Sequence, residues 1–213
     1  MKSLPRAYTK LNYIESSGTQ YIDTNRISTP NTKIELDYLS LKTDGGTYQN
    51  VFGSQESGGK KRIYIGIGST ELINTNFPQT NTHQVVYPKT DGTFATSTSE
   101  SNIVYVKYNN RNKIIYDLPN KSVTIGQYTA VNTNTLELCN SNHNILIFNR
   151  NDATIPTTGL AIGRLYSFKW YENNTLIMDL IPCKRNSDNE IGLYDLVNDV
   201  FYTNSGTGTF ITG

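Results

Sequence analysis

The residues best suited to bind a ligand are tyrosines and asparagines near the ends of expected strands. The chain has 15 tyrosines against 7 phenylalanines and 1 tryptophan. A sugar site needs a flat aromatic face for the C–H side of the ring, and short amide or charged groups for its hydroxyls. Ordinary exposed tyrosines are the alternative, because tyrosine tolerates a half-exposed position on a strand. The candidate ligand-binding residues are Tyr105, Tyr108, Asn109, Asn110, Arg111 and Tyr171.

The residue pattern supports a metal site or a catalytic nucleophile less well than it supports a sugar site. The two histidines are His83 and His143, and the chain contains no G-x-S-x-G nucleophile motif. Cys139-x-x-x-His143 has half of a zinc spacing, but no second closely spaced ligand pair accompanies it. We therefore predict no catalytic residue and no cofactor. Calcium stays an open alternative without a complete motif, suggested only by the oxygen-rich turns at 44–46, 91–92, 149–152 and 188–190.

Length and charge limit the classes of protein to which the chain can belong. The 213 residues fit one large domain, 1–213, better than two small ones. The net charge is +1, and the densest basic group, at 60–62, is expected to be a solvated loop, so we predict no nucleic-acid partner. The N-terminal residues show no apolar signal-peptide core, and no apolar run is long enough to span a membrane. We expect cytoplasmic synthesis without a signal peptide and no membrane insertion.

The spacing of apolar residues and turn residues indicates an all-β chain. Only 17% of the residues are charged, and much of the remaining polarity comes from Asn, Thr, Ser and Gly, which suit pleated strands and turns. Thr32 to Leu41 alternates cleanly, with Ile34, Leu36 and Tyr38 on one face and Glu35 and Asp37 on the other. About twelve to fourteen such short strands are expected, which is typical of a sandwich or barrel.

Turn residues and strand alternation also predict local structure, including a two-residue hairpin turn at Asn173-Asn174. Ile103–Tyr108 and Lys113–Asp117 are expected to form a hairpin around the asparagines at 109, 110 and 112, because Asn tolerates positive φ. Val123–Tyr128 is expected to be one strand, and the polar segment 94–102 a loop. Tyr166, Phe168 and Trp170 alternate on one strand face, which predicts that all three belong to the core.

Two segments at the chain ends carry a family resemblance. The N-terminal one is LNYIESSGTQYIDTN, and the C-terminal ones are GRLYSFKWYENNTLIMDLIPC and IGLYDLVNDVFYTNSGTGTF. They resemble domains of the concanavalin A-like lectin/glucanase superfamily, and more narrowly the laminin-G-like group found in bacterial surface proteins and in phage tail or virion proteins. The resemblance implies a two-sheet antiparallel jelly-roll β-sandwich in which the N-terminal and C-terminal strands are neighbours.

The glucanase branch of that superfamily uses a Glu-x-Asp-x-x-Glu strand with two catalytic glutamates. The nearest string here is Glu35-Leu36-Asp37-Tyr38-Leu39-Ser40, in which Ser40 stands where the final glutamate belongs. A retaining hydrolase needs two carboxyl groups about 5 Å apart across the sugar. Glu35 and Asp37, side by side on one strand, are expected to be a solvated outer face. We therefore expect that the protein is not an enzyme.

Three functions remain open from the sequence, in decreasing order of support. The first is a lectin-like module, in a phage receptor-binding or virion-surface protein, that attaches to glycans on a bacterial cell surface. The second is a purely structural virion or assembly protein, because a fold does not fix a function. The third is a glycoside hydrolase. The expected partners are a bacterial glycan and other virion proteins, with a homotrimer as one compatible assembly, and the expected location is the virion or the extracellular space.

Overall fold

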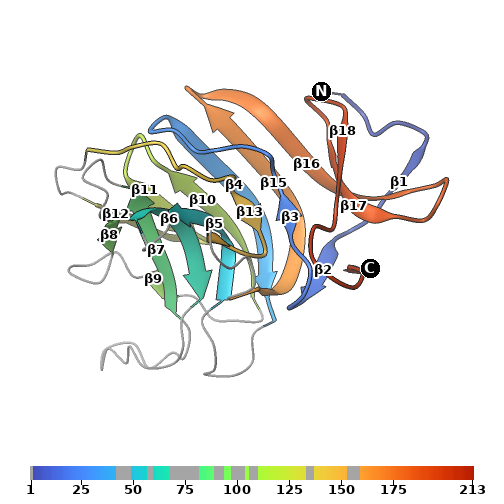
Figure 1. The fold of residues 1–213 in the computed structure, drawn as a ribbon, viewed down its shortest axis with the longest axis horizontal. Helices are drawn as coiled ribbons and strands as arrows, with labels where there is room; N and C mark the ends of the chain where they lie inside the picture. The colour runs from blue at the N-terminus through green and yellow to red at the C-terminus, as the bar shows by residue number, and fades with distance from the viewer. Residues whose placement is uncertain are drawn as a thin grey trace.

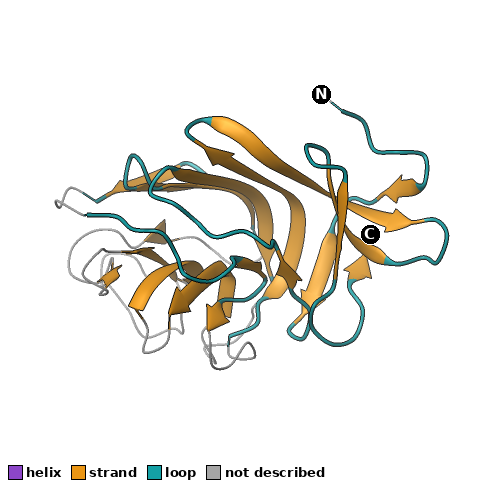
Figure 2. Cartoon of the chain, turned by 45° about the horizontal axis from the view of Figure 1, so that its top comes forward, coloured by secondary structure: helices purple, strands orange, loops and turns teal. Residues whose placement is uncertain are grey.

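The computed structural model of the chain is built from two β-sheets. It describes residues 2–41, 49–56, 60–67, 82–88, 94–96, 104–105, 110–132, 137–152 and 159–213. These residues contain strands, turns and loops but no helix (Figure 2). The predicted all-β class is therefore confirmed, as is the division into two sheets.

Sheet A carries the long strands. Its main path is β12 (Tyr128–Val131), β11 (Ser122–Ile125), β10 (Arg111–Asp117), β4 (Thr32–Ser40), β15 (Ile162–Glu172), β16 (Thr175–Arg185), β17 (Ile191–Asp195) and β18 (Val200–Thr203). Three short strands join it: β1 (Tyr8–Lys10) on β16, and β2 (Ile14–Ser17) between β15 and β19 (Ile211–Thr212). The β2–β19 pairing puts the first and last parts of the chain side by side, as expected from the resemblance.

Sheet B lies against one face of sheet A, with β5, β6 and β7 below β4, β15 and β16 in Figure 1. Its path is β3 (Ile22–Asp23), β13 (Leu146–Ile147), β5 (Gln49–Glu56), β6 (Lys60–Ile67), β7 (Thr82–Pro88) and β8 (Phe94–Thr96), with β14 (Asn151–Asp152) on β5 and β9 (Val104–Tyr105) on β7. The pairing of β14 with β5 is parallel, and the other strand pairs of this sheet are antiparallel.

The core fills the space between the two sheets. On β4, Ile34, Leu36 and Tyr38 are at most 2% exposed, as the alternation predicts. Aromatic rings connect the sheets: Phe52 of β5 lies 5.7 Å from the ring of Tyr116 and 6.4 Å from that of Phe168, edge to face in both pairs. Such edge-to-face packing of inward side chains stabilises a sandwich.

The predicted hairpin between residues 103 and 117 is wrong. β9 pairs with β7 in sheet B, whereas β10 pairs with β4 and β11 in sheet A. The asparagine-rich segment therefore connects two sheets and does not close a hairpin. Local turn chemistry could not show this, because the partner of each strand comes from a distant part of the chain.

Two smaller strand predictions also need correction. The stretch 123–128 is not one strand, because Gly126, with φ of 59°, turns the chain between β11 and β12. Phe94–Thr96, predicted to be loop, forms β8. By contrast, the two-residue turn between β15 and β16 is confirmed, since Asn173 and Asn174 have φ of 49° and 62°, the positive values that such a tight hairpin requires.

Candidate functional site

The outer face of sheet A, turned away from sheet B, carries the candidate site. On β4 the strand alternation that buries Ile34 and Leu36 turns Glu35 and Asp37 outward, as predicted. β10 and β15 are the two neighbours of β4, and on its other side β15 pairs first with β2 and then with β16. Side chains from β2, β4, β10 and β15 therefore meet on one surface.

A β-bulge in β15 brings an additional aromatic ring to this face. Leu165 lies opposite Tyr38 and Ser167 lies opposite Asp37, so Tyr166 is an extra residue in the pairing. Phe168 and Trp170 are fully buried, as predicted, but Tyr166 is only half-buried. The prediction that Tyr166 belongs to the core is wrong, because the bulge shifts the alternation by one residue and leaves its ring on the outer surface.

The ring of Tyr166 lines an open hollow of about 490 Å³, which we call the tyrosine hollow. The end of β1 and the segment between β1 and β2 form one side of it, and β10 and β15 form the other. The described residues that line it are Lys10, Leu11, Asn12, Tyr13, Arg111 and Tyr166. Aromatic rings, an amide and two cationic groups thus surround one depression.

Two stacked arginines hold the rings in place. The guanidinium carbon of Arg111 lies 3.6 Å from the centre of the Tyr166 ring, and that of Arg164 lies 4.4 Å from the centre of the Tyr13 ring. The two tyrosine rings meet edge to face, with 5.6 Å between their centres. Such cation–π and aromatic contacts fix the orientation of exposed rings.

Each arginine is fixed in turn by a carboxylate. Arg111 donates from Nε and Nη2 to the two oxygens of Asp37, both at 2.7 Å, and these hydrogen bonds raise the pKa of Arg111. Arg164 donates from Nε to Glu15 at 2.6 Å. The tyrosine hollow is therefore organised before any ligand binds, which lowers the entropy cost of binding.

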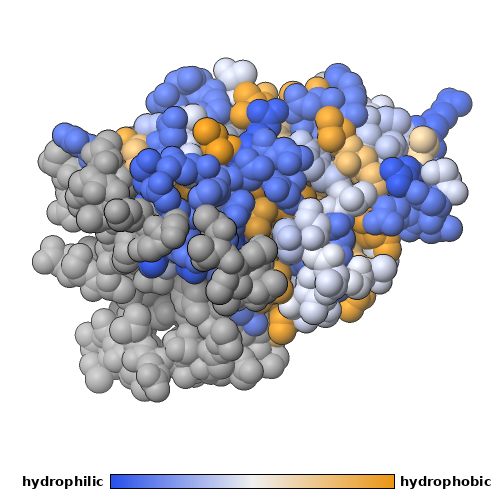
Figure 3. Space-filling view, in the orientation of Figure 1, coloured by the Kyte–Doolittle hydropathy of each residue, from blue (hydrophilic) through white to orange (hydrophobic). Residues whose placement is uncertain are grey.

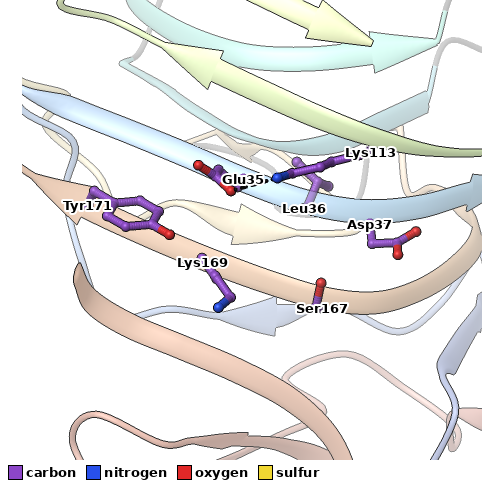
Figure 4. A pocket seen from close by; sticks show the side chains of 7 residues that line it. All are labelled: Glu35, Leu36, Asp37, Lys113, Ser167, Lys169 and Tyr171. Carbon is purple, nitrogen blue, oxygen red and sulfur yellow. Dashed lines mark ion pairs between the residues drawn. The ribbon is translucent and has the colours of Figure 1, made fainter. Parts of the chain in front are cut away.

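A second, smaller hollow adjoins the first along β15. It encloses about 200 Å³ and is lined by Glu35, Leu36, Asp37, Lys113, Ser167, Lys169 and Tyr171 (Figure 4). We call it the charged hollow. Asp37 lines it and binds Arg111 of the tyrosine hollow, so one ion pair lies between the two depressions.

Ion pairs hold Glu35 of the charged hollow in the ionised state. Glu35 lies 2.9 Å from the Nζ of Lys33 and 3.1 Å from that of Lys113. Burial alone would raise the pKa of Glu35, but the hydrogen bonds from the two lysines outweigh it, and the pKa lies below the ordinary 4.5. A glycosidase acid needs the opposite shift. Ser40, in the place of the final glutamate, points inward and is 4% exposed.

The structure places the six predicted ligand-binding residues in different environments. Arg111 lines the tyrosine hollow, and Tyr171 lines the charged hollow with Lys33 Nζ 4.8 Å from its ring centre. Asn110 is exposed just before β10. Tyr105 belongs to β9 in sheet B, so it does not share a sheet with Arg111. Tyr108 and Asn109 lie outside the described residues.

Sequence reasoning missed Lys10, Asn12 and Tyr13 as lining residues, and it assigned Tyr166 to the core. Tyr13 lies in the N-terminal motif, but nothing local indicates that it meets a residue 153 positions later. The bulge at Tyr166 exists only in the pairing of β15 with β4. The alternation of apolar and polar residues indicates neither the contact of Tyr13 with Tyr166 nor the bulge.

Within the described ranges, no group of three or more His, Cys, Asp or Glu side chains is arranged to hold a metal ion. The same residues include no helix that could cross a membrane. The chain matches no protein-family model and no curated protein sequence.

Proposed function

We propose that the protein is a non-catalytic, carbohydrate-binding module of the concanavalin A-like jelly-roll type, and that the tyrosine hollow is its sugar site. The observation that carries this proposal is the preorganised pair of Tyr13 and Tyr166 beside Asn12 and Arg111. Aromatic surface and a few hydrogen-bonding groups in an open depression are the features that sugar recognition needs.

Two further observations support a binding role over hydrolysis. Glu35 and Asp37 are each paired with cationic side chains, and the pKa of Glu35 is lowered, so neither is arranged as a proton donor. The pairing of β2 with β19 is what the laminin-G-like resemblance implies, and proteins of that group occur in phage virions and on bacterial surfaces. A glycan on a bacterial cell surface is the ligand class that we propose.

A glycan array followed by titration calorimetry tests the proposal. We expect at least one bacterial glycan to bind, and Tyr166→Ala to weaken it about tenfold or more, which is the size of a good aromatic contact in an interface. Tyr21→Ala is the matched control, because Tyr21 is half-buried against the core and does not line the hollow.

The outcome separates this function from the structural alternative. If no glycan and no host cell is bound, the lectin proposal fails. A stable trimer without any ligand, measured by light scattering, would then favour a structural role in a virion. Equal loss of binding in Tyr166→Ala and Tyr21→Ala would show that the sugar site lies elsewhere.

A further inference from the structure

The two charged side chains among the described lining of the tyrosine hollow are both cations. Its described lining includes Lys10 and Arg111 and no acidic side chain. Elsewhere on this face cations and carboxylates alternate, as in the Lys33–Glu35–Lys113 group. A depression lined by cations alone favours an anionic group on the ligand.

Among the described residues, hydrogen bonds occupy only one edge of the Arg111 guanidinium. Asp37 occupies the edge formed by Nε and Nη2. Nη1 has no hydrogen-bond partner among the described residues, so the Nη1/Nη2 edge keeps two parallel N–H donors. This fork matches the two oxygens of a carboxylate or of a sulfate ester.

Arg111 is also held in place for such a contact. Its guanidinium is fixed between the ring of Tyr166 and the carboxylate of Asp37, although its side chain is 54% exposed. An arginine that is already immobilised loses little entropy when it binds. Lys10, which is exposed on the other side of the hollow, adds a second positive charge.

We infer that the tyrosine hollow selects acidic sugars, whose carboxylate or sulfate group binds the open edge of Arg111 while the sugar ring contacts the tyrosines. This inference rests on the proposed carbohydrate-binding function. It adds the chemical class of the ligand and gives Arg111 the role of specificity-determining residue.

The test compares matched oligosaccharides on the intact protein. Each set holds a neutral glycan, its counterpart with a uronic acid at one position, and its counterpart with a sulfate ester there. We expect one acidic form to bind about tenfold or more tighter than the neutral form. The preference should shrink as NaCl rises from about 50 to about 500 mM, because exposed charges are screened.

Variants of Arg111 link the preference to the open edge. Arg111→Gln should bring the ratio of acidic to neutral affinity close to one, whatever its effect on the neutral form, because the charged fork is lost. Arg111→Lys should retain only part of it, because an ammonium group lacks the fork. The double variant Arg111→Gln/Asp37→Asn should lose the preference too, which excludes repulsion from a bare Asp37 as the cause.

Arg185→Gln is the control. Arg185 is also paired bidentately with an aspartate, Asp188, and lies over an aromatic ring, that of Phe201, but it does not line the hollow. This variant should keep the full preference.

The possible failures are distinguishable. Equal binding of neutral and acidic forms would overturn the inference and leave the lectin function standing. A preference that survives Arg111→Gln would overturn the role of Arg111. Lys10→Gln is a second test that does not depend on the folding of Arg111→Gln. An unchanged preference for the acidic form in Lys10→Gln would contradict the role of the two cations in selecting the ligand. No binding to any member of the sets would overturn this inference, and the lectin function fails with it only if the glycan array and the host cells are also not bound.

Discussion

The contact between Gly163 of β15 and Tyr38 of β4 allows a sharp stability test beneath the candidate site. A Cβ atom at position 163 would lie 2.6 Å from the carbonyl oxygen of Leu39, 2.5 Å from Cζ of Tyr38 and closer still to its hydroxyl. Tyr38 is 2% exposed and its ring packs 6.1 Å from that of Phe148, so it cannot swing away. Gly163 is also in register with Ser40, so the two strands cannot part without loss of pairing.

We expect Gly163→Ala to destabilise the protein strongly. Overpacking of a core costs about 1–3 kcal/mol, and the upper end applies here because the neighbours are a buried ring and a backbone carbonyl. For a chain of this length, about 3 kcal/mol corresponds to a fall in Tm of about 6–12 °C. Trp170, the single tryptophan and fully buried, reports unfolding in urea by its fluorescence.

Tyr38→Phe provides the matched partner for a double-mutant cycle. The Tyr38 hydroxyl is buried and has no hydrogen-bond partner in the described part of the chain, so its removal should change stability by less than about 1 kcal/mol. In the double variant, the clash with the hydroxyl disappears, and we expect a coupling of about 1 kcal/mol, with the remainder due to Cζ of the ring and the Leu39 carbonyl. A wild-type urea midpoint for Gly163→Ala, or no relief from Tyr38→Phe, would refute this packing argument.

Three further predictions concern the core, a titratable pair and a thiol. Phe168→Ala should cost about 3–5 kcal/mol in urea unfolding, because its ring is fully buried between the sheets, and a cost below about 1 kcal/mol would contradict the observed core. The pKa of Glu35 is lowered, mainly by Lys33 and Lys113 acting against burial, so its stabilising effect is complete above pH 4.5 and is lost as the pH falls through its folded pKa. The difference in urea midpoint between wild type and Glu35→Gln should therefore narrow below pH 4.5, and a constant difference would disprove the ion-pair explanation. Burial raises the pKa of Cys183 to about 12, so iodoacetamide at about pH 8 should leave it unmodified in the native protein, and its rapid labelling, seen by mass spectrometry, would be inconsistent with this position.

Some elements of the fold were predictable because their signal is local. On β4, the alternation assigned Ile34, Leu36, Tyr38, Glu35 and Asp37 to their observed faces. The turn between β15 and β16 was predictable for the same reason. Both depend only on the backbone geometry of a few consecutive residues, which residue type controls directly.

The described surface of the molecule carries no extended apolar patch in the view of Figure 3. Over the described residues in Figure 3, hydrophobic residues appear in small groups between hydrophilic ones. The large apolar side chains most exposed in the described part, such as Ile27, Val131, Val200 and Ile211, are scattered along the sequence. Single exposed apolar residues of this kind are normal in folded proteins and need no partner to explain them.

The candidate site was only partly predictable. Arg111 and Tyr171 were selected for their residue types, and both lie on the outer face of sheet A. Tyr166 was assigned to the wrong face, because the bulge opposite Tyr38 and Asp37 is a property of a strand pair. Tyr105 was expected in one hairpin with Arg111, although their strands belong to different sheets.

The sequence by itself determined that the chain forms amphipathic strands, where many of the turns fall, and which residues of a regular strand face the core. These properties depend on the conformational preferences and polarity of neighbouring residues. Only the tertiary structure decided which strands share a sheet, where β15 bulges, and that Tyr13 meets Tyr166 beside Arg111. The packing free energy of the whole sandwich decides which distant segments pair. A single extra residue in one strand of a pair then moves side chains from one face of the sheet to the other.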